Sequence, residues 1–219
     1  GTHIFYTSYL RGFPCIYRVP AEGGQRLPLA KFTGLNTGGA VSPDRKLMAL
    51  ILSISGNPEL YILNLSTRNL TRLTHTPRAV EASPDWSPDG QSLVYVSDVS
   101  GTPQLYVVHA TDKQPKRLTY RGGQNVAPDW GPDGRIVYCT RRQGYQIAVL
   151  NPATGEDEVL TSGPDHEDPS WAPDARHIIC SRRDRSTRST LYVLDTMGDP
   201  PLRLFARDGN WTSPDWSAR

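Results

Sequence analysis

The stretch Ser83-Pro84-Asp85-Trp86-Ser87-Pro88-Asp89-Gly90 decides the fold, because variants of it recur along the whole chain. Its turn portion recurs as Ser42-Pro43-Asp44, Gly131-Pro132-Asp133-Gly134 and Ala172-Pro173-Asp174, and a shortened copy begins at Trp216-Ser217. The steps between successive copies are 45, 44, 41 and 45 residues. Self-similarity at a fixed period is typical of repeat architectures, so we expect repeated units of about 44 residues.

Two further series keep the same period. An apolar pair follows each turn, as Ile16-Tyr17, Leu60-Tyr61, Leu105-Tyr106, Ile147-Ala148 and Leu191-Tyr192. A second pair comes later in each copy, as Arg26-Leu27, Arg72-Leu73, Arg117-Leu118, Val159-Leu160 and Arg203-Leu204. Three series in one phase indicate a single repeated unit.

Each unit is predicted to hold four strands, named A to D here. In the clearest copy they cover residues 81–86, 92–97, 104–108 and 115–120. The Pro88-Asp89-Gly90 turn joins strands A and B, since Pro fixes φ and Asp can bond the backbone. Short strands with a turn about every 10 residues are typical of an antiparallel meander. The predicted fold is therefore all-β, a five-bladed β-propeller of four-stranded antiparallel blades whose stacked sheets cover one another.

The ends of the chain fall inside one blade of this single predicted domain, residues 1–219. The start, from His3 to Thr7, reads as a strand B, and the end, from Ser213 to Ser217, reads as a strand A. We therefore expect the C-terminal strand to complete the N-terminal blade and protect both edges. The predicted blades are 1–35 with 210–219, then 36–79, 80–123, 124–164 and 165–209. If the five blades do not close, self-association between chains is expected instead.

The composition of the chain disfavours nucleic acid and membranes as partners. The chain has 219 residues and a net charge of +2, which gives no strong attraction to nucleic acid. No apolar run approaches the roughly 18 residues of a membrane span, so we expect no direct membrane insertion. No signal peptide is visible, although a mature chain would have lost one. Cys15, Cys139 and Cys180 show no CxxC spacing and are predicted to be free and buried, with Cys139 and Cys180 on opposite faces of their sheets.

Motifs of catalysis are missing from the sequence. It contains no GxSxG, no HExxH and no Gly-rich phosphate loop, and its five His do not occupy equivalent positions. The densest polar cluster is Asp165-His166-Glu167-Asp168. Adjacent strand residues point to opposite faces, so these four side chains cannot all converge on a metal. We predict no enzyme activity, no cofactor and no metal site; a solvated loop is the expected role of the cluster, and a cation in the channel is the alternative.

The repeat resembles a known family. The copy from Ser83 to Gly90, followed by Leu105-Tyr106 and Arg117-Leu118-Thr119, resembles the TolB-like repeat of WD-like Pro-Asp propellers. The order of variants and the ending Pro214-Asp215-Trp216-Ser217 resemble the C-terminal propeller of that family. The resemblance implies a periplasmic protein of the Tol–Pal cell-envelope system that binds the peptidoglycan-associated lipoprotein at its propeller. The family's propeller has six blades and follows an α/β domain, so we expect this chain to be one blade short of that propeller.

Binding residues are expected at the mouth of a central channel. In a propeller, strand A lines that channel. The mouth is therefore formed by the loops from strand D to strand A and by the first residue of each strand A, five residues before the Trp, or Val41, that precedes the turn. The candidate binding residues are Asn36, Arg78, Glu81, Arg121, Gln124, Asn125, Asp165, His166, Glu167 and Trp211. Solvation of the mouth alone is the alternative interpretation.

A basic loop between strands B and C is the second candidate surface. It contains Arg182-Arg183-Asp184-Arg185 and Arg188, and Arg141-Arg142 occupies the corresponding loop of the blade before. We predict that these residues lie on the rim opposite the D-to-A loops, as a solvated loop or as a patch for an anionic partner. Aromatic interleaving is missing, which disfavours single-stranded nucleic acid.

Three functional hypotheses remain open. The first is a non-catalytic protein-binding propeller that docks a periplasmic partner at the channel mouth. The second is an engineered or truncated propeller with no retained natural partner. The third is a propeller accessory to a hydrolase, which requires a catalytic domain elsewhere in the parent chain.

Overall fold

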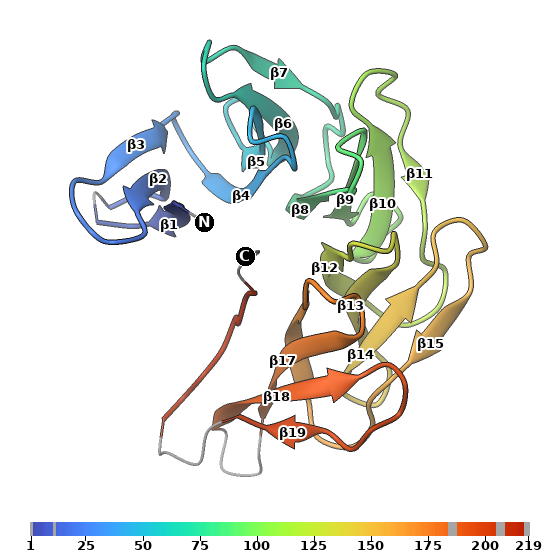
Figure 1. Ribbon diagram of the computed structural model, residues 1–219. Coiled ribbons are helices and arrows are strands. Elements are labelled where there is room, and N and C mark those ends of the chain that lie inside the picture. Colours follow the sequence, from blue (N-terminus) through green and yellow to red (C-terminus); the bar gives the residue numbers. More distant parts are fainter. Residues whose placement is uncertain (1, 11, 184–187, 205–208, 217–219) are drawn as a thin grey trace. The chain divides into compact units, whose positions relative to one another are not determined.

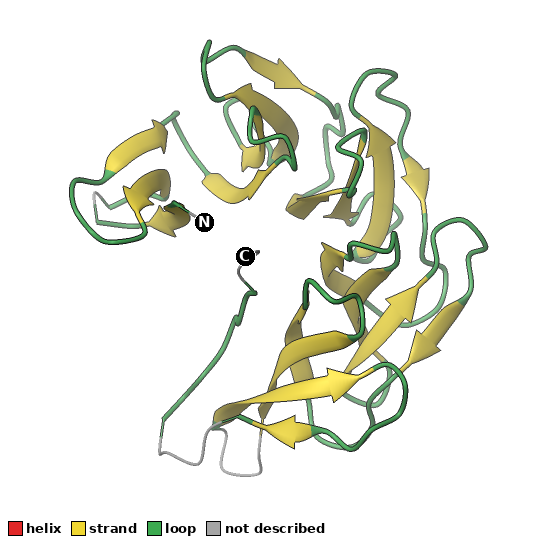
Figure 2. Ribbon diagram, viewed as in Figure 1, coloured by secondary structure: helices red, strands yellow, loops and turns green. Residues whose placement is uncertain are grey.

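The computed structural model describes residues 2–10, 12–183, 188–204 and 209–216. These residues form strands joined by loops and turns, with no helix among them (Figure 2). A search of the same residues finds no helix that is long and apolar enough to cross a membrane. The all-β class predicted from the repeat is confirmed.

The strands assemble into five antiparallel sheets (Figure 1). Within the described residues the first sheet has three strands, β1 (His3–Ser8), β2 (Cys15–Pro20) and β3 (Leu27–Ala30). The second sheet has β4 (Asn36–Val41), β5 (Leu47–Leu52), β6 (Glu59–Asn64) and β7 (Leu70–Arg72). The third has β8 (Glu81–Trp86), β9 (Ser92–Ser97), β10 (Gln104–His109) and β11 (Lys116–Arg117). The fourth has β12 (Asn125–Trp130), β13 (Ile136–Arg141), β14 (Tyr145–Leu150) and β15 (Asp157–Val159). The fifth has β16 (His166–Trp171), β17 (His177–Arg183), β18 (Ser189–Asp195) and β19 (Leu202–Arg203).

The chain divides into two compact units, which are described separately. One contains the described residues up to 102 together with 106–116. The other contains residues 103–105 and the described residues from 117 onward. The first and second sheets thus lie in the first unit, and the fourth and fifth lie in the second.

The turn between strands A and B is a hydrogen-bonded cap built by its Ser and Asp. In the second sheet, the Ser42 hydroxyl donates to Asp44 at 2.7 Å and accepts from the Leu47 amide at 2.9 Å. In the third sheet, Ser87 repeats both bonds with Asp89 at 2.6 Å and with the Ser92 amide at 2.9 Å. The Ser-Pro-Asp turns are therefore structural, because their polar side chains satisfy the turn's own backbone.

Every strand A carries a β-bulge at the same position. The ladder between strands A and B shifts register between Thr37 and Ala40 in β4, and at the matching residues of β8, β12 and β16. The residue in the bulge has positive φ each time: Gly38 at 72°, Ser83 at 47°, Ala127 at 49° and Asp168 at 53°. A bulge of this kind re-aims the side chains that follow it.

The cores lie between successive sheets. In the first unit, one cluster joins Ile51, Leu60 and Ile62 of the second sheet to Trp86 and Tyr95 of the third. In the second unit, a cluster joins Val137, Ile147 and Val149 of the fourth sheet to Trp171 and Ile178 of the fifth. Trp86 is 4% exposed and Trp171 is 5% exposed, so these two Trp residues, each at the end of a strand A, are core residues.

The cysteines are free and buried, as predicted. Cys139 lies on β13 and Cys180 on β17, on opposite faces of their own sheets. Because those sheets are stacked, both faces look into the same interface: Cys139 Sγ contacts the His166 carbonyl at 3.4 Å, and Cys180 belongs to the cluster shared with Val137. Burial raises the pKa of both thiols, to about 12 for Cys180, so they stay protonated.

The C-terminal segment 209–216 has the backbone of a strand A. Ser213 has φ of 50°, which matches the bulge position of the other strands A. Ser213 donates from its amide and its hydroxyl to Asp168 at 3.1 Å, and Ser170 donates to Asp215 at 3.1 Å. Among the described residues this segment forms no strand ladder, so its predicted pairing with β1 remains a prediction.

Candidate functional site at the loop end of the sheets

The loops before strand A and after strand B meet at one end of each sheet, which we call the loop end. The first residue beyond strand B bonds the residue that precedes strand A: Ser53 to Leu35 at 3.3 Å, and Asp98 to Val80 at 3.4 Å. In the second unit the last residue of strand B makes the equivalent bond, Arg141 to Gln124 and Arg183 to Asp165, both at 2.8 Å. The prediction that the basic B-to-C loop lies opposite the D-to-A loops is therefore wrong. An antiparallel A–B hairpin necessarily brings the start of A beside the end of B.

The first residue of strand A is buried, although it was predicted to be a binding residue of the channel mouth. Asn36 and Asn125 are 0% exposed, Glu81 is 1% exposed and His166 is 5% exposed. Their side chains turn into the loop that precedes them. They therefore stabilise the loop that precedes strand A, and no partner can reach their side chains in this conformation.

The two asparagines show how this support works. Asn36 Nδ2 donates to the carbonyls of Phe32 at 2.8 Å and Gly34 at 3.0 Å, while its Oδ1 accepts from the Phe32 amide at 2.8 Å. Asn125 Nδ2 donates to the Arg121 carbonyl and to Gln104 Oε1, both at 2.8 Å. The amide side chain thus replaces the backbone ladder that the loop lacks.

The same network includes a Thr in the loop and a Gln at the start of strand C. Thr119 donates to Gln104 Oε1 at 2.8 Å and accepts from the Leu105 amide at 3.0 Å. Thr161 donates to Gln146 at 2.8 Å and accepts from the Ile147 amide at 2.9 Å. Sequence reasoning missed these residues, although a Thr directly after Leu73, Leu118 and Leu160 was a usable signal.

The third set replaces the amides by two carboxylates, Glu59 and Glu81. Thr74 donates to Glu81 Oε2, and the Leu60 amide reaches the same oxygen at 3.0 Å. Glu59 Oε1 accepts from the Thr76 amide at 2.8 Å and from Arg72 at 2.7 Å. Both carboxylates are buried, at 0% exposure for Glu59 and 1% for Glu81.

These surroundings separate the two carboxyl groups in acidity. Burial raises the pKa of Glu81 to about 7, against the opposing hydrogen bond of Thr74, and the charge of Glu59 raises it further. Burial also opposes ionisation of Glu59, but hydrogen bonds from Thr74, Thr76 and Arg72 outweigh it and lower the pKa of Glu59. Glu59 is thus the charged member of the pair, and Glu81 is the member that holds a proton near neutrality.

The Asp165–Asp168 cluster does not converge. Asp165 accepts from the Tyr145 amide at 2.8 Å, Glu167 pairs with Arg183 at 3.2 Å, and Asp168 binds Ser213 at 3.1 Å. Burial lowers the pKa of His166, so its imidazole is neutral at pH 7. Within the described part of the chain, no group of three His, Cys, Asp or Glu side chains could hold a metal.

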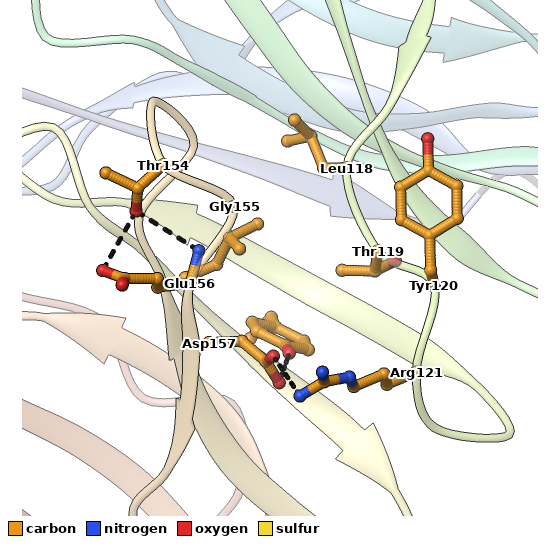
Figure 3. A pocket seen from close by; sticks show the side chains of 10 residues that line it. Leu118, Thr119, Tyr120, Arg121, Thr154, Gly155, Glu156 and Asp157 are labelled. Carbon is orange, nitrogen blue, oxygen red and sulfur yellow. Dashed lines mark hydrogen bonds and ion pairs between the residues drawn. The ribbon is translucent and has the colours of Figure 1, made fainter.

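The remaining predicted residues differ in exposure. Arg78 is exposed, Trp211 is 41% exposed and Gln124 is half-buried, where its Oε1 accepts from the Tyr145 hydroxyl at 2.8 Å. Arg121 points to Asp157, at 3.8 Å, across a pocket of about 320 Å³ in the second unit (Figure 3). Tyr138 and Arg142 also lie 3.4 Å from Asp157. Of the residues predicted for one mouth, therefore, only some are placed to meet a partner.

The basic B-to-C residues are engaged locally. Arg182 lies 5.1 Å over the Tyr192 ring, Arg141 lies 5.9 Å over the Tyr145 ring, and Arg183 pairs with Glu167. Asp184 and Arg185 fall outside the described residues. These contacts hold the arginines against their own sheets.

A row of exposed aliphatic residues at the loop end escaped the sequence reasoning. The second residue after strand B is Leu10 after β1, Ile54 after β5 and Val99 after β9. Their exposures are 70%, 42% and 54%. All three belong to the first unit, where exposed Val80 and Arg78 occupy the neighbouring D-to-A loop. Exposed aliphatic residues thus recur at one structural position in three sheets of the first unit.

Repeated antiparallel meanders, each with a bulged strand A and a Trp or its equivalent before the turn, define the β-propeller class. The chain belongs to the family of the TolB beta propeller domain, whose model matches residues 1–219. The resemblance drawn from the Ser83–Gly90 repeat is thereby confirmed.

Individual relatives carry the same name. The Tol-Pal system protein TolB of Francisella tularensis subsp. tularensis (strain WY96-3418) is 32% identical over 228 residues, covering 100% of this chain and 52% of that protein. The crystal structure of TolB from Acinetobacter baumannii superposes with a TM-score of 0.87 at 30% identity, covering 98% of this chain and 54% of that one. This chain thus spans about half the length of these relatives. Puromycin hydrolase, with a TM-score of 0.70 at 17% identity over 90% of this chain and 34% of its own, shares the fold alone.

Proposed function

We propose that this chain is a non-catalytic protein-binding propeller of the Tol–Pal type, which docks a partner such as the peptidoglycan-associated lipoprotein at the loop end. Membership of the TolB propeller family supports the assignment of this chain to the Tol–Pal system. The observation that carries the surface is that Leu10, Ile54 and Val99 are exposed at equivalent positions, with exposed Arg78 in the loop that precedes β8. The periplasm is the proposed location, by the same family relationship.

The mechanism is docking on a firm support. The buried Asn36, Glu81 and Asn125 each stabilise the loop that precedes their strand, so little conformational entropy of these loops is lost when a partner binds. The aliphatic row supplies apolar contact, while Arg78 at its side gives orientation. Arg78 in the first unit, and Gln124 and Trp211 in the second, are each proposed as a contact residue at the loop end of their own sheet, and the buried residues as structural support.

Calorimetric titration with the soluble domain of the peptidoglycan-associated lipoprotein tests this proposal. Ile54→Ser and Val99→Ser are each expected to weaken binding by about tenfold, since a buried interface side chain contributes roughly 1–2 kcal/mol. Met197→Ser is the matched control, because Met197 is 78% exposed in a turn after β18, away from the loop end. Equal losses in all three variants contradict the proposed surface, and no binding by the unmodified chain favours a truncated propeller without its partner.

An accessory role beside a hydrolase is the weaker proposal. The likeness to puromycin hydrolase shows the fold alone. This proposal would be tested by looking for a catalytic domain in the parent chain.

A further inference from the structure

The hydroxyl group of Thr76 lies between the two buried carboxylates. Its Oγ1 is 3.0 Å from Glu81 Oε1 and 3.3 Å from Glu59 Oε2. A Thr hydroxyl carries a single hydrogen and can accept two bonds. When both carboxylates are ionised, one of these two oxygen–oxygen contacts therefore has no hydrogen in it.

One added proton completes the network. With a hydrogen on Glu81 Oε1, Glu81 donates to Thr76, and Thr76 donates to Glu59 Oε2. The other contacts of the pair already have donors. For Glu81 these are Thr74 and the Leu60 amide, which Glu81 shares with the Thr74 oxygen, and for Glu59 they are the Thr76 amide, Arg72 and Asn57. Buried polar networks are stable only when each member is satisfied, so the ionised form is the weaker one.

The neighbouring loop supplies a neutral counterpart. There Gln104 stands in place of Glu59 and Asn125 in place of Glu81, and the Asn125 amide donates directly to Gln104 at 2.8 Å. That network needs no proton, because an amide carries its own donors. The comparison isolates the carboxylates as the feature that makes one loop sensitive to pH.

We propose that Glu81 and Glu59 form a proton-operated latch, which fixes the loop 73–80 when Glu81 is protonated and releases it when Glu81 ionises. The loop carries Arg78 at the loop end, so release alters the surface that a partner would meet. The effect on partner binding rests on the proposed function, whereas the latch itself does not.

Other charged groups around Glu81 do not mask this titration. Glu59 faces it from β6 with its partner Arg72 from β7, and Tyr95 faces it from β9. Burial and the nearby carboxylates raise the pKa of Tyr95 far above neutrality, so the phenol stays protonated. His75, in the same loop, is exposed. Glu81 is thus the buried group of this cluster that changes charge near neutral pH.

Hydrogen exchange of single amides tests the latch without any partner. The Leu60 amide, which donates to both Glu81 and Thr74, reports on Glu81, and the Thr76 amide reports on Glu59. The Leu105 amide, which donates to Thr119 in the neutral network, is the internal control. We expect protection factors at Leu60 and Thr76, corrected for intrinsic exchange, to fall by about tenfold between about pH 6 and about pH 8, with Leu105 unchanged. Equal changes at all three amides overturn the latch.

Two variants sharpen the result. Glu81→Gln places a neutral donor at the protonated position, and the double variant Glu59→Gln with Glu81→Asn copies the neutral network. Both are expected to keep their protection across the same range. If neither variant folds, the titration of Glu81 in the unmodified chain, followed by the NMR shift of its carboxyl carbon, decides alone: a midpoint below about pH 5 overturns the proposal.

The effect of the latch on partner binding is tested in a separate experiment. Affinity of the unmodified chain for the lipoprotein is expected to change over the range in which the loop is released, and that of Glu81→Gln is expected to stay constant. If the unmodified chain binds the lipoprotein at neither pH, the proposed function fails while the exchange measurement still decides the latch. If it binds with the same affinity at both, the latch does not control the surface.

Discussion

The carboxylate of Asp129 accepts a hydrogen bond of 2.6 Å from the backbone amide of Trp171. Asp129 lies in β12 and Trp171 ends β16, so this bond ties the strands A of two successive sheets. Burial raises the pKa of Asp129 to about 6, against the opposing bond from Trp171, and the charge of Asp215 raises it further. The tie therefore depends on pH.

The first prediction concerns Asp129→Asn. The pKa of Asp129 is raised above its ordinary 3.8, so its stabilising contribution is full below that value and is lost as pH rises through about 6. The amide keeps an acceptor for Trp171 without a charge. We expect the stability of the variant relative to the unmodified chain to rise by roughly 1–3 kcal/mol from about pH 4 to about pH 7. Urea unfolding across that range measures it, and parallel pH curves would contradict it.

The second prediction compares two tryptophans of the repeat. Trp86 is 4% exposed, and its indole N–H donates to the Ala40 carbonyl at 3.1 Å, whereas Trp216 is 37% exposed. Trp86→Ala is expected to cost about 3–5 kcal/mol, because it opens a cavity between two sheets. Trp216→Ala is expected to cost less, by at least about 2 kcal/mol. Denaturant midpoints measure both, and equal losses would show that the two positions are packed alike.

The third prediction tests the bulge. Ser83 is exposed with φ of 47°, so Ser83→Gly is expected to gain up to about 1 kcal/mol by removing left-handed strain. The converse change, Gly38→Ala, is expected to lose at least about 1 kcal/mol, because φ is 72° and the new Cβ would lie 2.7 Å from Pro84 Cδ. Thermal unfolding separates the two, and a loss on Ser83→Gly refutes the assignment of strain.

The fourth prediction concerns the neutral loop support. Thr119→Val leaves the Leu105 amide without its hydroxyl acceptor and removes a donor to Gln104. We expect a loss of about 1–3 kcal/mol, since the orphaned groups are buried. Thr119→Ser keeps the hydroxyl and is expected to lose less than about 1 kcal/mol. Equal losses in both variants would contradict this prediction, because Thr119→Ser keeps the hydroxyl that Thr119→Val removes.

The strands follow closely from the sequence because the repeat fixes their phase. Residues 81–86 and 92–97 were predicted as strands, and β8 and β9 have those bounds. Strand D of the same unit was predicted over 115–120, but β11 covers only Lys116–Arg117. Pro115 has no N–H to give a ladder, and Leu118 bonds Leu105 beyond the assigned strand. The sequence pattern thus located strand D correctly, and the missing N–H of Pro115 is one reason why the observed strand is shorter than predicted.

The candidate site could be predicted only in part. The repeat placed Asn36, Glu81 and Asn125 at equivalent positions, but the alternation of a strand does not show that their side chains bond the loop before it. Their partners, such as Gln104 for Asn125, lie 21 residues away in the chain, a relationship that pattern alone does not reveal. The exposed Leu10, Ile54 and Val99 were missed because single apolar loop residues are common in any sequence.

The repeated bulge has a consequence for errors in folding. A strand that must place a left-handed residue opposite a fixed gap in the ladder fits its neighbour in one register, and the proline after Ser83, Ala127, Asp168 and Ser213 withholds the N–H that a slipped register would use. Sliding is therefore blocked within each hairpin. Because the copies share the same bulge, however, the strand A of one repeat has the backbone that fits the strand B of another. We therefore expect misfolding of this chain to exchange strands A between repeats rather than to shift the register of one hairpin.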